Sequence, residues 1–305
     1  MMKKNLLIIS LSVGVVLIGV VLFMYIRHEQ ATEKKLSELS EQLHANENNE
    51  TTKKEQTNET NKQAENETAE ENENKLTNTI TEAVKKTVDF FTNQEVNIVA
   101  LGDSLTQGIG DSSEQGGYVG LIEQSINETN KKAHVTNFGK RGDRTDQLLK
   151  RMEDPKIATS LKEADIVLIT IGANDIMQVL KENITNITYE AFEKERTNYE
   201  KRLHAIFSLI QANNNHAEVY LLGFYNPFER YFQEIKELSM IVNEWNKTSK
   251  KVTEQYNHTT YIPTKDLFNS KEKTLFAADH FHPNQQGYQR MAQRVLEYIT
   301  NREER

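Results

Sequence analysis

Residues 96–108 of the sequence are VNIVALGDSLTQG, and they combine two patterns that determine the fold. The first six residues form a short apolar run rich in β-branched side chains, which is typical of a buried strand. The Gly102-Asp103-Ser104 turn that follows indicates a sharp passage into a helix, at which a serine hydroxyl can be exposed. The stretch therefore predicts the first strand of an α/β domain, with a candidate nucleophile at its carboxyl end.

Apolar runs of the same kind recur along the chain and alternate with amphipathic segments. The expected strands are residues 96–101, 135–138, 166–171, 219–222 and 260–262. The expected helices are residues 118–129, 145–152, 191–212, 232–256 and 285–299. Because strands and helices alternate over about 210 residues, we expect a three-layer α/β/α fold with a five-stranded parallel sheet. In such folds the reactive groups lie at the carboxyl ends of the strands.

Two further motifs contain side chains that can take part in catalysis. Residues 172–175 (GAND) follow the third expected strand, and residues 279–283 (DHFHP) precede the last expected helix. A structural interpretation is open for the first of them, since Asn and Asp favour turns and helix caps. In the second, a carboxylate three residues before a histidine can fold back to hold the imidazole ring, as Asp279 can for His282.

Together these motifs resemble the SGNH branch of the GDSL-type lipases and acylhydrolases. The resemblance covers about residues 96–299, and the four sequence blocks of the family occur in order at the expected strand ends. It implies a flavodoxin-like SGNH hydrolase fold. It also implies that carboxylic esters are hydrolysed by a serine mechanism, which requires neither a cofactor nor a metal.

The resemblance assigns a catalytic role to three residues. Ser104 matches the nucleophile of the family, and His282 matches the general base that takes its proton and later protonates the leaving alcohol. Asp279 matches the residue that orients this histidine. The order Ser, Asp, His along the chain is also found in other α/β esterases.

The resemblance also indicates which groups would stabilise the oxyanion of the reaction. Gly142, in residues 137–143 (NFGKRGD), matches a glycine whose backbone N–H binds the oxyanion, although Gly139 lies close to it in the sequence. Asn174 matches an asparagine whose side-chain amide completes the oxyanion hole with the backbone N–H of Ser104. The serine, glycine, asparagine and histidine that characterise the family are therefore all present, as Ser104, Gly142, Asn174 and His282.

Two other functions are compatible with parts of the sequence. Asp279, His280 and His282 could bind a metal with Asp103 as a fourth ligand, but this leaves the serine and asparagine motifs unexplained. A surface-exposed module could have kept the fold for binding alone, but such a relative is expected to have lost at least one of the matching residues.

The fourth expected strand leads into an aromatic loop, residues 223–228 (GFYNPF). Tyr225, Asn226 and Phe228 could contact the substrate, or they could pack beneath the loop. The candidate substrates are lipid esters and the O-acetyl groups of a carbohydrate or cell-wall polymer. Because the loop is aromatic and poor in sugar-binding polar groups, we expect a lipase or acylesterase.

Residues 1–28 are predicted to form a transmembrane anchor. The segment 6–26 contains 21 residues without a charge, which as a helix would span roughly 31 Å, about the thickness of the bilayer core. A cleaved signal peptide is the alternative, but its apolar region is usually shorter. Lys3 and Lys4 favour a cytoplasmic N-terminus, which would place the rest of the chain outside the cell membrane, as expected for a membrane-anchored bacterial form of the family.

Residues 29–92 are predicted to be a polar linker, followed by the hydrolase domain at 93–305. Within it, 28 of the 32 residues 44–75 are Asn, Glu, Thr, Lys or Gln, a composition that cannot bury a core. A random coil of that length spans roughly 30 Å, which suits a tether.

The charge and the cysteine content exclude several classes of function. The tract 44–75 carries nine Glu and four Lys, so it contributes −5 to the net charge of −8. The rest of the chain has no basic patch, and we expect no nucleic-acid partner. The chain has no cysteine, which excludes disulfides, thiol nucleophiles and cysteine-bound metals.

Overall fold

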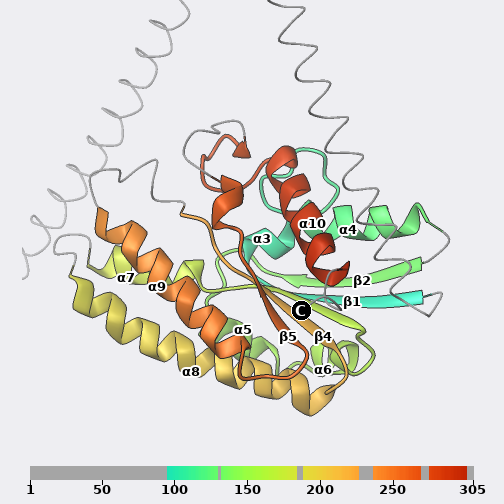
Figure 1. Ribbon diagram of the computed structural model, residues 1–305, viewed down its shortest axis with the longest axis horizontal. Coiled ribbons are helices and arrows are strands. Elements are labelled where there is room, and N and C mark those ends of the chain that lie inside the picture. Colours follow the sequence, from blue (N-terminus) through green and yellow to red (C-terminus); the bar gives the residue numbers. More distant parts are fainter. Residues whose placement is uncertain (1–94, 130–131, 184–187, 227–235, 269–274, 301–305) are drawn as a thin grey trace, which may run out of the picture. The chain divides into compact units, whose positions relative to one another are not determined.

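The computed structural model describes residues 95–129, 132–183, 188–226, 236–268 and 275–300. The described chain contains five strands: β1 (Glu95–Gly102), β2 (Lys132–Gly139), β3 (Ile166–Thr170), β4 (Glu218–Leu222) and β5 (Thr259–Ile262). They pair in parallel in the order β2-β1-β3-β4-β5 (Figure 1). The structure thus confirms the predicted α/β fold with its five-stranded parallel sheet, and the strand order is that of flavodoxin-like folds.

Side chains that alternate along the central strands fill two separate cores. In β1, Ile98 and Ala100 belong to one core, whereas Val99 and Leu101 belong to the other. All five residues of β3 are buried, because strands flank it on both sides and helices cover both faces. This double burial explains why the strands appear in the sequence as continuous apolar runs.

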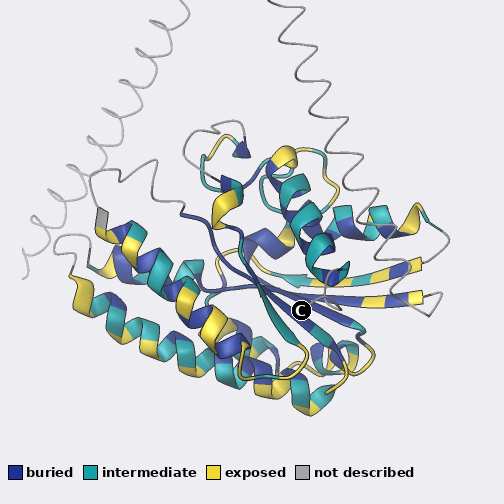
Figure 2. Ribbon diagram, viewed as in Figure 1, coloured by how far each residue is buried: buried dark blue, intermediate teal, exposed yellow. Residues whose placement is uncertain are grey.

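Helices cover the two faces of the sheet unequally (Figure 1). One layer contains α3 (Ser104–Gln107), α4 (Gly117–Asn127), the short 3₁₀ helix η1 (Lys265–Phe268) and α10 (Gln285–Thr300). The other contains α5 (Thr145–Arg151), α6 (Pro155–Lys162), α7 (Ala173–Glu182), α8 (Tyr189–Asn213) and α9 (Lys236–Thr253). Figure 2 shows the buried residues along the strands and on the helix sides that face the sheet.

Helices α6 and α7 are not among the helices expected from the sequence. Helix α6 begins at Pro155 behind an Asp154 cap, whose side chain accepts a hydrogen bond from the Lys156 N–H at 2.9 Å. Helix α7 begins directly after Gly172, which has a φ of 119°. The motif at 172–175 is therefore the start of a helix as well as a turn, and its Asn and Asp lie in the first helical turn.

Within the ranges given above, no helix is long and apolar enough to cross a membrane. The predicted anchor at 1–28 and the predicted linker at 29–92 lie outside the described residues. Both stay predictions.

Candidate active site

Ser104 lies at the carboxyl end of β1, where the strand order of the sheet reverses between β1 and β3. It is the first residue of α3, and the Asp103 side chain caps this helix by accepting a hydrogen bond from the Leu105 N–H at 3.0 Å. Gly102 allows the turn, because a Cβ at this position would lie 2.1 Å from the Thr170 carbonyl oxygen. The crevice at such a reversal is where open parallel sheets bind their ligands.

A buried polar network supports the turn from below. The Thr170 hydroxyl donates to the Asp103 carboxylate at 2.9 Å and accepts from the Thr106 N–H at 3.1 Å. Burial raises the pKa of Asp103 to about 7, and hydrogen bonds from the Leu105 N–H and from Thr170 only partly oppose this effect. Asp103 therefore connects β1, β3 and α3 through its hydrogen bonds.

The imidazole ring of His282 connects Ser104 to a carboxylate. Its Nε2 lies 2.9 Å from Ser104 Oγ, and its Nδ1 lies 2.5 Å from Asp279 Oδ2. Ser104 and His282 are each 5% exposed. The structure thus brings together the three residues that the sequence motifs single out, across 178 residues of chain.

The Asp279 carboxylate is held by its own loop. Its Oδ1 accepts hydrogen bonds from the backbone N–H groups of Phe281 at 3.0 Å and His282 at 2.9 Å. Burial opposes its ionisation, but the hydrogen bonds from the His282 side chain and from these two N–H groups outweigh it and lower the pKa of Asp279. The carboxylate is therefore ionised at neutral pH, where it can stabilise a charged imidazole.

Two neighbours that the motifs do not include fix the position of the histidine loop. The Tyr225 hydroxyl donates to the Phe281 carbonyl oxygen at 2.7 Å. Gly110 packs against the histidine, because a Cβ added there would lie 2.8 Å from His282 Cβ and 2.5 Å from the Pro283 carbonyl oxygen. Gly110 also has a φ of 96°, a conformation that favours glycine.

Gly142 lies in the loop between β2 and α5, and Asn174 lies in the first turn of α7. Gly142 is exposed with a φ of 82°, and in the described chain no atom would lie within 4 Å of a Cβ added there. Gly139, in contrast, ends β2 and packs closely against the end of α3. A Cβ added to Gly139 would lie 2.3 Å from the backbone N of Gln107. Of the two glycines, Gly142 is thus the one whose surroundings leave space for a bound molecule.

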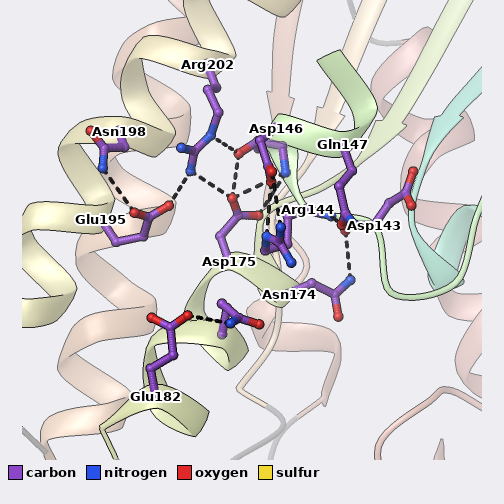
Figure 3. Close-up of polar contacts among 12 residues, drawn as sticks. Asp143, Arg144, Asp146, Gln147, Asn174, Asp175, Glu182, Glu195, Asn198 and Arg202 are labelled. Carbon is purple, nitrogen blue, oxygen red and sulfur yellow. Dashed lines mark hydrogen bonds and ion pairs between the residues drawn. The ribbon is translucent and has the colours of Figure 1, made fainter. Parts of the chain in front are cut away.

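The Asn174 side chain connects the start of α7 to the loop that carries Gly142. Its Nδ2 donates to the Asp143 carbonyl oxygen at 3.0 Å (Figure 3). The Asp143 carboxylate in turn accepts from Arg151 Nε at 2.6 Å, and the same guanidinium donates to the Phe138 carbonyl oxygen at 2.9 Å. The loop that carries Gly142 is therefore anchored both to the end of β2 and to the start of α7.

Of the aromatic loop, the structure describes Tyr225 and Asn226, and both are buried. Tyr225 lies beneath the histidine loop and packs on Phe268, with ring centroids 4.3 Å apart. The Asn226 side chain donates through Nδ2 to Ser239 Oγ at 2.7 Å. Phe228 lies outside the described residues. Both side chains thus have packing partners, and substrate contact stays a prediction for Tyr225, Asn226 and Phe228.

The geometry does not favour the metal interpretation. Both ring nitrogens of His282 are hydrogen-bonded, and Asp103 is held beneath α3 rather than beside the histidine. No group of three or more His, Asp or Glu residues that could hold a metal ion occurs in the part of the chain that the structure describes.

Comparison with known proteins identifies the family. Residues 100–290 match the model of the GDSL-like Lipase/Acylhydrolase family. The chain belongs to this family. This membership confirms the family that the sequence motifs resemble, and it supports an ester hydrolase.

Two relatives and one solved structure each match between 64% and 72% of this acylhydrolase. It is 37% identical to the uncharacterized protein YpmR of Bacillus subtilis (strain 168) over 225 residues, 72% of this chain and 88% of the relative. It is 29% identical to the spore germination lipase LipC of Bacillus licheniformis over 201 residues, 64% of this chain and 92% of the relative. The crystal structure of the lipase Lip_vut3 from a goat rumen metagenome has a TM-score of 0.59 at 26% identity, covering 66% of this chain and 95% of that one.

Proposed function

We propose that this acylhydrolase is a serine esterase or lipase in which Ser104 attacks the carbonyl carbon of a carboxylic ester. The observation that carries the proposal is the chain of contacts from Ser104 Oγ through His282 to Asp279, at 2.9 and 2.5 Å. A serine hydroxyl is a weak nucleophile unless an adjacent base takes its proton, and His282 Nε2 is within reach to do so.

The reaction has two halves with His282 as the proton carrier. As the bond between Ser104 Oγ and the carbonyl carbon forms, Nε2 takes the hydroxyl proton. When the tetrahedral intermediate collapses, the alcohol leaves with that proton, and an acyl group stays on Ser104. Water then attacks the acyl-enzyme, gives its proton to Nε2, and the carboxylic acid is released as the proton returns to Ser104. Asp279 stabilises the charged imidazole in both halves.

Three donors would bind the negative oxygen of the intermediate: the backbone N–H groups of Ser104 and Gly142 and the side-chain amide of Asn174. An amide nitrogen carries two hydrogens. One of those on Asn174 is donated to the Asp143 carbonyl oxygen, which leaves the other hydrogen for an oxyanion.

We further propose that the substrate is a lipid or other acyl ester at the outer surface of a bacterial cell membrane, to which residues 1–28 anchor the enzyme. The uncharged segment 6–26 supports the anchor, and the similarity to a lipase of Bacillus supports the substrate class. This location is tested by cell fractionation. Full-length protein should be found with the membranes, and protein that lacks residues 1–28 should not; equal distribution of the two would contradict it.

The serine mechanism is tested by the hydrolysis of p-nitrophenyl esters from acetate to palmitate. The detergent-solubilised full chain is compared with Ser104→Ala and with Ser112→Ala, an exposed serine of the neighbouring loop. We expect turnover that a chelator does not affect, that Ser104→Ala abolishes and that Ser112→Ala keeps. A preference for long chains would support a lipase, and one for acetate an O-acetylesterase. Turnover that survives Ser104→Ala would contradict the mechanism.

A further inference from the structure

A buried carboxylate lies directly next to the predicted oxyanion-hole asparagine. Asp175 follows Asn174 in the first turn of α7, and it is completely buried. Its Oδ1 accepts from the Thr145 hydroxyl at 2.5 Å, and its Oδ2 accepts from the Thr145 N–H at 3.1 Å. Thr145 is the first residue of α5, three positions after Gly142. This one carboxylate therefore ties the start of α7 to the end of the loop that carries Gly142.

A third element completes the arrangement from the other side. Arg202 of α8 donates through Nη2 to Asp175 Oδ1 at 3.0 Å and through Nε to the Thr145 hydroxyl at 2.6 Å. Glu195, about two turns earlier on α8, contacts the same guanidinium (Figure 3). The Thr145 hydroxyl thus accepts from Arg202 and donates to Asp175, so the three side chains form a closed triangle.

The surroundings of Asp175 have opposing effects on the pKa of its carboxyl group. Burial is the largest effect and raises its pKa to about 6, while the hydrogen bonds from Thr145 and the charge of Arg202 work in the opposite direction. Arg144 also lies near enough for Asp175 to raise the pKa of its guanidinium. At neutral pH the carboxylate is therefore mostly ionised and can hold both partners.

We propose that Asp175 is a positioning residue, which with Thr145 and Arg202 holds the start of α7, with Asn174, and the loop with Gly142 in the geometry of the oxyanion hole. This inference rests on the proposed function. The two donors come from different segments of the chain, and donors stabilise a transition state only when they are held in place before the reaction. Asp175 itself is buried and does not contact the substrate.

A purely structural role for the triangle makes a different prediction. Buried charge pairs often contribute little net stability, although removing one partner is costly. If Asp175 only stabilises the fold, its loss lowers the melting temperature and leaves the kcat of the folded enzyme unchanged. A positioning role lowers kcat of the folded enzyme and changes KM little, because the donors act on the transition state.

The test measures kcat, KM and the melting temperature of the full-length enzyme on one p-nitrophenyl ester. For Asp175→Asn, we expect kcat to fall about 10- to 100-fold, the effect of a small misplacement of catalytic groups, with KM within about threefold. Thr145→Ser keeps the hydroxyl and should keep most of the activity, whereas the isosteric Thr145→Val should behave like Asp175→Asn. If Asp175→Asn does not fold, the comparison of Thr145→Ser with Thr145→Val tests the proposal in its place.

Two controls separate positioning from stability. Ile210→Val lies about two turns further along α8, is buried in the core, and should lower the melting temperature without changing kcat. In the double variant Asn174→Ala/Asp175→Asn, kcat should fall by clearly less than the product of the single effects, because both changes damage the same donor.

The outcomes distinguish this inference from the proposed function. If the wild type hydrolyses the ester and Ser104→Ala does not, but Asp175→Asn and Thr145→Val keep wild-type kcat, the positioning role is wrong and the serine mechanism stands. Strictly multiplicative effects of Asn174→Ala and Asp175→Asn also contradict it. If Ser104→Ala keeps the activity or the wild type has none, the proposed function itself fails, and the inference fails with it.

Discussion

The buried carboxylate of Asp103 should make the protein less stable as the pH rises from acid to neutral. Its pKa is raised from the ordinary 3.8 to about 7, chiefly by burial. In the folded protein it therefore keeps its proton up to about pH 7, whereas in the unfolded chain it loses the proton near pH 3.8. Its contribution to stability is fully present below pH 3.8 and is lost as the pH rises through 7.

The size of this effect follows from the shift. About three pH units at 1.36 kcal/mol each correspond to about 4 kcal/mol, of which about 3 kcal/mol is lost between pH 5 and pH 8. Asp103→Asn removes the titration but keeps an oxygen that can accept from the Leu105 N–H and the Thr170 hydroxyl. Asp175 titrates in both wild type and Asp103→Asn. The difference in unfolding free energy between the two proteins therefore isolates the contribution of Asp103.

The assay is urea unfolding of wild type and Asp103→Asn at pH 5 and pH 8. Trp245 is the single tryptophan of the chain and is 1% exposed, so its fluorescence reports unfolding of the hydrolase domain. We expect the unfolding free energy of the variant, relative to wild type, to rise by about 3 kcal/mol from pH 5 to pH 8. A difference that is the same at both pH values would refute the reasoning.

Three further substitutions test other parts of the site, each measured as kcat together with the melting temperature. Gly110→Ala places a methyl group against His282 and should lower kcat about 100-fold; an unchanged kcat would show that the histidine loop adapts freely. Asn174→Ala should lower kcat about 100- to 1,000-fold, and a loss below tenfold would remove it from the oxyanion hole. Tyr225→Phe breaks the bond to the Phe281 carbonyl and should cost about 1 kcal/mol of stability; a variant as stable as wild type would contradict this.

The strands and the catalytic loops were predictable because local sequence determines them. Val99 and Leu101 alternate with Ile98 and Ala100 in a run without a charged residue. Such a run is typical of a strand whose two faces are both covered by helices. Ser104, Asn174 and His282 lie in short sequence motifs, so each could be located without knowledge of its partners in the fold. Ser104 and Asn174 follow the neighbouring strands β1 and β3, whose carboxyl ends lie at the same edge of the parallel sheet.

Helix α7 was missed for a local reason. Its first residues, 172–175, are of the types that favour turns, and this outweighed the helical spacing of Ile176, Val179 and Leu180, which are all buried in the structure. The signal was present, but a turn and a helix start share the same residue types.

The supporting contacts were missed because no local pattern encodes them. Asp175 bonds Thr145 and Arg202 across 30 and 27 residues of chain, and only the folded sheet brings them together. Tyr225 could be located at a strand end, but whether its side chain contacts substrate or packs beneath a loop depends on partners that follow more than 40 residues later, such as Phe268. The N-terminal anchor and linker lie outside the described residues and stay predictions.

The central claim, that Ser104 is the nucleophile, is tested most directly by covalent labelling. The full-length enzyme and Ser104→Ala are treated with a fluorophosphonate, which reacts with activated serines, and the modified peptide is identified by mass spectrometry. The account predicts one adduct, on Ser104, formed by the wild type and absent from the variant. An adduct on another serine, or none on an enzyme that hydrolyses esters, would contradict it.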